Sequence, residues 1–269
     1  MKYRPLALLA TGLLALTQAQ AAAVLYDDFG ATTGLDRSKW SEAEAGRYID
    51  GKGKLNLLRY LYSSTASDAG LTLESFNNSL PLTTPLKSLK ATVAVQTFKQ
   101  DEPCAANPAV GQSTARLIGS HFNIRAGGPV AGDRTGDVVA QVRVRRASNS
   151  ADPAGVLQVQ AVLSQCTNAD CSTSALITPA NGGSNPVLLT TVTTGTALKL
   201  GYSWDKTTKT FNYVAGANAA SITYAESHKS APVQLFGNLS LRNEVPNCTA
   251  QRTKAGIAAT FDNVYLDTY

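Results

Sequence analysis

Residues 198–213 read LKLGYSWDKTTKTFNY, and this stretch predicts a β-hairpin. From Leu198 to Trp204 every second residue is apolar, which is the alternation of a strand with one buried face. The polar run Lys206–Lys209 predicts a turn, and Thr210–Tyr213 returns as a second strand. The hairpin therefore offers one apolar face for packing in a sheet.

Period-two alternation continues through the chain, and clusters of Gly, Pro, Asn, Asp, Ser and Thr separate the segments. It predicts strands at Val24–Phe29, Lys54–Tyr62, Leu71–Phe76, Leu89–Phe98, Leu117–Arg125, Val138–Arg145, Val156–Gln165, Val187–Val192, Leu198–Trp204, Thr210–Val214, Ser221–Tyr224, Val233–Arg242 and Ala255–Leu266. No segment after the N-terminal leader holds a helical apolar stripe. The expected fold class is all-β, and regular strand spacing points to a sandwich or jelly roll.

Two further segments carry a resemblance to a known superfamily. Residues 24–42 read VLYDDFGATTGLDRSKWSE, and residues 256–269 read GIAATFDNVYLDTY. With the hairpin, they resemble the concanavalin A-like jelly rolls, which include lectins, laminin-G-like domains and polysaccharide-active sandwiches. The resemblance implies a two-sheet antiparallel jelly-roll sandwich with its first and last strands side by side. Four large side chains are expected to anchor the core, rather than form a ligand platform: Phe29, Trp40, Trp204 and Phe261.

The N-terminus has the three parts of an export signal. Lys2 and Arg4 are basic, Leu6–Leu16 is apolar, and Ala19-Gln20-Ala21 is a small-x-small cleavage site. We expect residues 1–21 to be a cleavable signal peptide and residues 22–269 to form a single β-sandwich domain. The alternative is an N-terminal anchor or a buried helix, but the apolar run is shorter than the ~20 residues of a membrane span. The predicted location is secreted or periplasmic, in the cell envelope, with no integral membrane segment after cleavage.

The charge of the chain is modest. It has 24 basic and 19 acidic residues, a net charge of +5, and removal of Lys2 and Arg4 leaves 22 against 19, or +3. A nucleic-acid-binding protein would show a concentrated basic footprint, so no nucleic-acid partner is expected. A local basic patch that faces an acidic partner is still compatible with this charge. The sequence does not indicate an oligomeric state.

Four cysteines follow the leader, an even number that predicts disulfides in an exported protein. Cys166 and Cys171 bracket a turn-forming insert and are expected to pair locally, which leaves Cys104 with Cys248. Four cysteines allow three connectivities, and this one alone joins the two close neighbours. A metal site is disfavoured, because the spacing is not C-x-x-C and no histidine is nearby.

One polar face is the candidate ligand-binding surface. In three predicted strands, polar residues alternate with apolar ones, and these strands would form one polar field if they are neighbours. The residues proposed for this face are His121, Asn123, Arg125, Gln141, Arg143, Arg145, Gln158 and Gln160. Arginine forks bind carboxylate or sulfate and amides bind hydroxyls, so the expected ligand is a glycan, in particular an anionic one. The alternative is the ordinary solvated face of an antiparallel sheet.

Catalysis is the second hypothesis. Some jelly-roll polysaccharide lyases use Arg or Gln to neutralise a uronate, and His or Tyr to exchange protons. Here His121 would be the base and Tyr202 or Tyr213 the acid, but the strand motifs of those lyases are missing. The E-x-D-x-x-E motif of the β-glucan hydrolases is also missing, so a hydrolase is less favoured than an anionic-glycan lyase.

Acidic residues at the two ends suggest a structural cation. If the first and last strands pair, the carboxylates of Asp27, Asp28, Asp262 and Asp267 could converge on calcium. The alternative is that these side chains cap turns or bond to the backbone. The cofactor expectation is therefore no certain cofactor and a possible structural calcium.

Three functions follow in order. The leading hypothesis is a non-catalytic exported β-sandwich that binds glycan or has a structural role at the cell envelope or outside the cell. The second is a polysaccharide-degrading enzyme, and the third is a surface adhesion protein. The sequence leans against an enzyme but does not decide the matter, because a fold does not fix a function.

Overall fold

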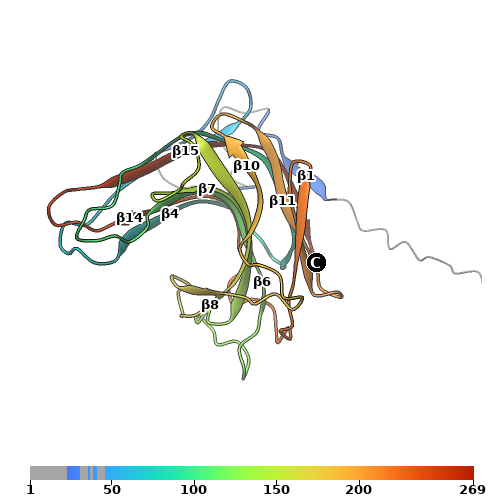
Figure 1. Cartoon of the computed structure of the whole chain (residues 1–269). Coiled ribbons are helices and arrows are strands. Elements are labelled where there is room, and N and C mark those ends of the chain that lie inside the picture. The colour runs from blue at the N-terminus through green and yellow to red at the C-terminus, as the bar shows by residue number, and fades with distance from the viewer. Residues whose placement is uncertain (1–22, 31–35, 37–38, 41–45) are drawn as a thin grey trace, which may run out of the picture.

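The protein forms two antiparallel β-sheets that pack face to face (Figure 1). The computed structural model describes residues 23–269 except 31–35, 37–38 and 41–45. No helix occurs in that part of the chain. The strands are β1 (Val24–Asp27), β2 (Arg47–Ile49), β3 (Leu55–Tyr62), β4 (Leu71–Ser79), β5 (Leu86–Gln100), β6 (Gln112–Asn123), β7 (Asp137–Ala147), β8 (Val156–Cys166), β9 (Ser174–Leu176), β10 (Val187–Thr193), β11 (Leu198–Asp205), β12 (Thr210–Ala215), β13 (Asn218–Thr223), β14 (Gly237–Pro246) and β15 (Lys254–Thr268).

The strand order confirms the expected sandwich. One sheet runs β13-β12-β11-β5-β15-β3-β2, with β1 paired to β15, and the other runs β10-β8-β7-β6-β14-β4, with β9 paired to β8. Val24 lies opposite Leu266, so the first and last strands are side by side as the resemblance implied. Each of the 13 predicted strands corresponds to an observed one. The two that were missed, β2 and β9, have three residues each, too few to show an alternation.

The core lies between the sheets. Phe29, Trp40, Trp204 and Phe261 are all buried, which confirms that both tryptophans belong to the core. Each indole nitrogen also has an acceptor, as buried tryptophans require. Trp40 Nε1 donates to Asp27 Oδ2 at 2.7 Å, and Trp204 Nε1 donates to Tyr224 Oη at 2.7 Å.

Two disulfides fasten the loops with the expected connectivity. Cys104 is bonded to Cys248 across 144 residues, and Cys166 is bonded to Cys171 across five. The predicted signal peptide lies outside the described residues. Among the residues that are described, no helix is long and apolar enough to cross a membrane.

Candidate functional site

A groove lies on the outer face of the seven-stranded sheet, on the side away from the core. The ribbon of this sheet is strongly bent (Figure 1), and the groove is lined by side chains of β4, β14, β6, β7 and β8. These five strands are neighbours in the order β8-β7-β6-β14-β4. Because alternate residues of a strand point to the same face, each strand contributes every second side chain to the groove.

The strand register aligns the polar side chains in rows across the sheet. The first row is Asn77, Ser240, Arg116, Arg143 and Gln160. The second row, two residues further along, is Ser75, Arg242, Thr114, Arg145 and Gln158. We call these two sets the arginine rows. Neighbouring strands are about 4.8 Å apart, so the four guanidiniums lie within one compact area.

Arg116 lies at the middle of the first row and is 7% exposed. Its Nε donates to Ser240 Oγ at 3.2 Å, and its Nη2 donates to Ser75 Oγ at 3.1 Å. Burial, helped by the positive charges of Arg242 and Arg143, lowers the pKa of Arg116 to about 9. The guanidinium therefore still carries its charge at neutral pH.

A second set of contacts orients Arg143 and Arg145. Arg143 donates to Gln160 Oε1 from Nε at 3.2 Å and from Nη2 at 2.9 Å, while Arg145 Nη1 reaches the same oxygen at 3.4 Å. Burial lowers the pKa of Arg143 to about 10, with a further contribution from the charge of Arg145. The amide of Gln160 fixes the direction of both guanidiniums but adds no negative charge.

Two carboxylates adjoin the arginine rows. Glu244 accepts from Arg242 Nε at 2.6 Å and from Gln112 Nε2 at 2.8 Å, and Asp152 Oδ2 accepts from Gln158 Nε2 at 2.9 Å. Four guanidinium charges exceed these two negative charges, so the area that the rows cover is net cationic.

Several polar atoms of the groove residues are buried but have no hydrogen-bond partner among the described residues. They are Asn77 Oδ1, Gln141 Oε1 and Asn238 Oδ1, and Arg145 Nε, in the second arginine row beside the groove, is in the same condition. An unsatisfied buried polar group costs about 1–3 kcal/mol. Polar atoms left in this condition on a groove wall are suited to a ligand that supplies the missing partners.

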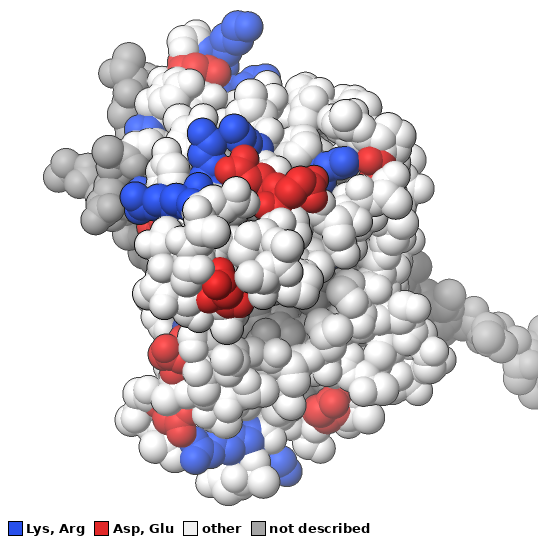
Figure 2. Space-filling model, turned by 60° about the vertical axis from the view of Figure 1, so that its left-hand side comes forward, with Lys and Arg blue, Asp and Glu red and all other residues white. Residues whose placement is uncertain are grey.

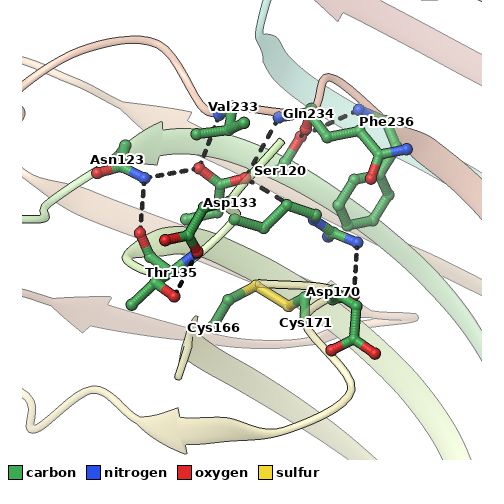
Figure 3. Close-up of polar contacts among 12 residues, drawn as sticks. Ser120, Asn123, Asp133, Thr135, Cys166, Asp170, Cys171, Val233, Gln234 and Phe236 are labelled. Carbon is green, nitrogen blue, oxygen red and sulfur yellow. Dashed lines mark hydrogen bonds and ion pairs between the residues drawn. A yellow bond between two sulfur atoms is a disulfide. The ribbon is translucent and has the colours of Figure 1, made fainter. Parts of the chain in front are cut away.

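A buried carboxylate, that of Asp137, lies beside residues that line the groove. Asp137 accepts from Asn123 Nδ2 at 2.9 Å and from the backbone nitrogens of Val233 at 2.8 Å and Gln234 at 3.3 Å. Arg134 Nε lies 3.8 Å from the same carboxylate, at ion-pair distance but too far for a hydrogen bond. The Cys166–Cys171 disulfide lies beside this network (Figure 3).

Arg134 in turn forms part of the groove wall. Its guanidinium lies 4.9 Å from the ring centroid of Phe236, and its Nη1 donates to the backbone oxygen of Asp170 at 3.3 Å. Burial lowers the pKa of Arg134, against the opposing effect of Asp137 and Asp170. The loops that carry these residues are thus held together where the groove ends.

The predicted polar face is only partly assembled. The three strands proposed for it, β6, β7 and β8, are neighbours, and five of its side chains point to the groove side: Gln141, Arg143, Arg145, Gln158 and Gln160. The other three, His121, Asn123 and Arg125, do not join this face. His121 has the same parity as Ala115 and Leu117, so regular alternation points it to the core, and a bulge between Ser120 and Phe122 brings Phe122 to the core face as well.

These three residues lie in separate environments. His121 is fully buried between the sheets, and its Nδ1 lies 2.9 Å from the backbone oxygen of Leu86. Asn123 is buried against Asp137. Arg125 pairs with Asp133 in the loop that follows β6.

The proposed catalytic acids also lie elsewhere. Tyr202 and Tyr213 are buried in the core, and Tyr213 Oη donates to the backbone oxygen of Val162 at 3.1 Å. Burial raises the pKa of each phenol above its ordinary value. Neither these tyrosines nor His121 lines the groove, so the acid–base assignment made from the sequence was wrong in its geometry.

Sequence reasoning missed the groove residues of β4 and β14 and one of β6. The main ones are Asn77, Asn238, Ser240, Arg242 and Arg116. Alternation in residues 239–244, which read LSLRNE, was the available signal. It could not show that β14 lies between β6 and β4, because that pairing is long-range.

The four acidic residues proposed for calcium are only partly together. Asp27 accepts from Trp40 Nε1, and Asp267 pairs with Lys87 at 3.2 Å. Burial raises the pKa of Asp262, and the charges of Asp28 and Asp50 raise it further. Within the described residues no group of three or more metal-ligating side chains is assembled. The calcium expectation stays a prediction, which a melting curve with and without a chelator would measure.

The charge of the surface is local. Figure 2 shows a face on which basic and acidic side chains gather in the upper and the lower part, with large uncharged areas between them. This agrees with the modest net charge of +5 for the whole chain. Attraction of a polyanion must therefore come from a particular site and not from the molecule as a whole.

No family model matches the chain, and no curated protein matches it either. Among solved structures, it is similar to the kappa-carrageenase from Pseudoalteromonas carrageenovora, at 12% identity and a TM-score of 0.45, over 93% of this chain and 99% of that one. It is also similar to alginate lyase A1-II', a member of polysaccharide lyase family 7, at 11% identity and a TM-score of 0.42, over 84% and 85%. A prokaryotic beta-1,3-1,4-glucanase (lichenase) derived from a mouse hindgut metagenome matches at 8% identity and a TM-score of 0.41, over 92% and 99%.

These three structures are all of glycan-degrading enzymes. The leading hypothesis from the sequence, a non-catalytic module, has no counterpart among them. At these identities and TM-scores, the similarity carries no substrate, activity or residue role over to this chain.

Proposed function

We propose that the groove of the seven-stranded sheet binds an acidic polysaccharide laid across the strands. The arginine rows carry this proposal. Arg116 and Arg242 line the groove, and Arg143 and Arg145 continue the same face beside it. The four guanidiniums outnumber the carboxylates of Glu244 and Asp152, and the other side chains of the rows are amides and hydroxyls. Guanidiniums bind carboxylate or sulfate through paired N–H donors, and amides and hydroxyls match the hydroxyls of a sugar.

The dimensions suit a polymer. The rows cross five strands, and four strand spacings of about 4.8 Å give a length of roughly 19 Å. A single monosaccharide would occupy only a fraction of this length. The buried amide oxygens of Asn77, Gln141 and Asn238 lie along the same surface and would accept hydrogen bonds from successive sugar hydroxyls.

A nucleic acid fits this groove less well. Proteins that bind single strands offer aromatic rings on which bases stack. Among the described lining residues Phe236 is the one aromatic side chain, and the guanidinium of Arg134 lies over its ring. The groove therefore supplies charge and hydrogen bonds but no stacking platform.

Degradation of the bound polysaccharide by β-elimination is the second candidate. Arg116 and Arg143 lie directly opposite each other on β6 and β7 and could neutralise one uronate carboxylate, which acidifies the adjacent C–H bond. A base must then take that proton, while the glycosidic C–O bond breaks and the leaving oxygen is protonated. Glu244, beside the groove on the same face of the sheet, is bonded to Arg242, and its charge acts on both Arg116 and Arg143.

Binding is tested by affinity electrophoresis in gels that contain polygalacturonate, alginate or chondroitin sulfate, with neutral dextran as the reference. We expect retardation by the polyanions, which weakens as salt screens the charges. The double variant Arg143→Gln/Arg145→Gln should lose most of the retardation, by about tenfold or more in Kd. The matched control is Arg252→Gln, which removes an exposed guanidinium that lies over Tyr62, away from the groove. Equal retardation of both variants and the wild type would refute the proposal that the groove binds the polysaccharide.

Elimination is tested with the same polymers. A lyase would generate the ultraviolet absorbance of an unsaturated sugar end, and Glu244→Gln should lower the rate while binding is retained. Retardation without any such absorbance from a panel of uronate polymers would leave binding as the function and exclude the second candidate for those polymers.

We also propose that the protein acts outside the cytoplasm. The leader residues Lys2, Arg4 and Leu6–Leu16 support export, and the two disulfides fit an oxidising compartment. Cell fractionation and N-terminal sequencing of the mature chain test this, with a start at Ala22 expected. An intact Met1 on cytoplasmic protein would contradict it.

A further inference from the structure

A second cavity opens at one end of the sandwich and shares no lining residue with the groove. It is bounded by the β11–β12 turn, by residues 227–231, by Pro85 and by Tyr269. Phe122 of one sheet and Trp204 of the other form its inner part, so it opens toward the space between the sheets. We call it the mouth pocket.

The charge at the mouth pocket is positive. Lys206, Lys209 and Lys229 line it, and no aspartate or glutamate is among the lining residues. None of the three lysines forms an ion pair with a described residue, although Lys209 Nζ donates to the backbone oxygen of Ala225 at 3.1 Å. The carboxylate of Asp205, adjacent to the turn, accepts hydrogen bonds from the backbone nitrogens of Thr207 and Thr208.

His228 is hydrogen-bonded to Tyr224 in this pocket. Trp204 Nε1 donates to Tyr224 Oη, and that oxygen is in contact with His228 Nε2. Burial lowers the pKa of His228, and the charges of Lys206 and Lys209 lower it further. When the phenol donates to Nε2, the neutral ring carries its proton on Nδ1, a donor with no partner among the described residues.

His121 adds an acceptor. It lines the same pocket, and its Nδ1 must donate to the backbone oxygen of Leu86 because a carbonyl cannot donate. Its Nε2 thus carries a lone pair, and this fully buried atom has no partner in the described structure. The pocket combines cationic groups, a free N–H and a free acceptor around aromatic rings.

We propose that the mouth pocket is a binding site for a single acidic sugar. Its anionic group lies among Lys206, Lys209 and the Nδ1–H of His228, and its ring packs against Tyr269, which is 47% exposed. A hydroxyl of the same sugar can donate to His121 Nε2. The pocket is distinct from the groove, and the ligand can be a free monosaccharide or the end of an oligosaccharide chain.

Nitrogen-15 NMR of the histidine side chains tests this proposal directly, since the chain contains only two histidines. Sodium glucuronate should shift the His228 signals in a saturable way, and glucose at the same concentration should not. A glucuronate-ended oligosaccharide tested in parallel separates a chain end from a free sugar. Sodium sulfate is the third probe, and equal affinity for sulfate would refute recognition of a sugar.

The variants separate this site from the groove. Lys206→Gln/Lys209→Asn should weaken glucuronate binding by about tenfold or more, and asparagine suits position 209 because its φ is 51°. Arg143→Gln/Arg145→Gln should leave the pocket titration unchanged, and the lysine variant should leave retardation by polygalacturonate unchanged. The proposal is overturned if wild-type protein shows no saturable shift, or if the groove variant abolishes it.

Discussion

The two faces of β6 hold the clearest contrast in the molecule. Arg116 points into the groove and His121 points between the sheets, and burial lowers the pKa of both side chains. The pKa of Arg116 falls to about 9 and that of His121 to about 3. At pH 7 the first is therefore charged and the second neutral. Burial lowers the pKa of both groups, but the ordinary pKa of arginine is 12.5 and that of histidine is 6.5. Arg116 therefore stays charged on the outer face, and His121 stays neutral in the interior.

The contrast follows from the alternation of β6, because Arg116 and His121 are an odd number of residues apart. Ala115 and Leu117 face the core, and strict alternation would keep the odd-numbered residues there and send Phe122 outward. The bulge between Ser120 and Phe122 puts His121 and Phe122 on the inner side together. Alternation thus points Arg116 to the outer face and His121 to the core, and the β-bulge adds Phe122 to the core face.

Asp137→Ala is expected to have the largest effect, since it breaks the anchor of the bulged end of β6. The fully buried carboxylate holds Asn123 and the backbone of Val233 and Gln234, and its removal leaves those donors and Arg134 uncompensated. Breaking a buried charged network of this kind costs about 3 kcal/mol. Urea unfolding at neutral pH measures the loss.

The matched control for that variant is Asp152→Ala. Asp152 is also in a loop beside the seven-stranded sheet, but its carboxylate accepts hydrogen bonds from two side chains, Ser150 and Gln158, and from no backbone nitrogen of the described residues. The Asp152→Ala substitution should lower the free energy of unfolding by about 1 kcal/mol or less. Equal losses in the two variants would show that Asp137 does not anchor the strand end.

The next largest effect is on the pH dependence of stability, and it comes from His121. Its pKa is 6.5 in the ordinary state and about 3 in the fold, so below pH 6.5 the unfolded chain binds a proton that the folded chain does not. The free energy of unfolding therefore has its full value, as far as His121 is concerned, above pH 6.5, and it falls as the pH is lowered toward 3. Between pH 7 and pH 5 the free energy of unfolding falls by about 2 kcal/mol.

His121→Phe isolates that contribution. At pH 8 the variant should be less stable than the wild type by about 1–3 kcal/mol, because the carbonyl of Leu86 loses its donor. At pH 5 the gap should narrow, since phenylalanine cannot be protonated. His228 also has a lowered pKa and is retained in both proteins, so it cancels in the difference. A gap that is constant with pH would contradict the burial of a neutral imidazole.

The parts of this architecture that the sequence predicted are those with uninterrupted alternation. The hairpin at Leu198–Tyr213 and the strand β7 show it clearly, and β7 correctly placed Gln141, Arg143 and Arg145 on one face. The core roles of Trp40 and Trp204 were predictable from size and apolarity. In these segments local pattern and tertiary packing agree.

The rest depended on information that no local pattern contains. The residues around 120–122 read SHF, with no glycine or proline to mark the bulge. The contact of Arg116 with Ser240 spans 124 residues of sequence, so the groove could be assembled only from the strand order. Tyr202 and Tyr213 were read as possible acids because their chemistry allows it, whereas the alternation of β11 and β12 buries them.

Arg116→Met sharpens the comparison with the smallest expected change in stability. Methionine keeps much of the volume of the arginine stem and removes a desolvated charge that lies near Arg242 and Arg143. Replacement of a buried charge by an apolar residue of similar size is often neutral or stabilising, so we expect a gain of about 1 kcal/mol or no change. Polygalacturonate binding should nevertheless weaken by about tenfold, because the middle of the first arginine row is lost. Unfolding and affinity electrophoresis on the same preparation measure both quantities. A variant that loses stability and binding together would show that Arg116 holds the sheet, whereas a stable variant with weakened binding would show that its buried charge is kept for the ligand.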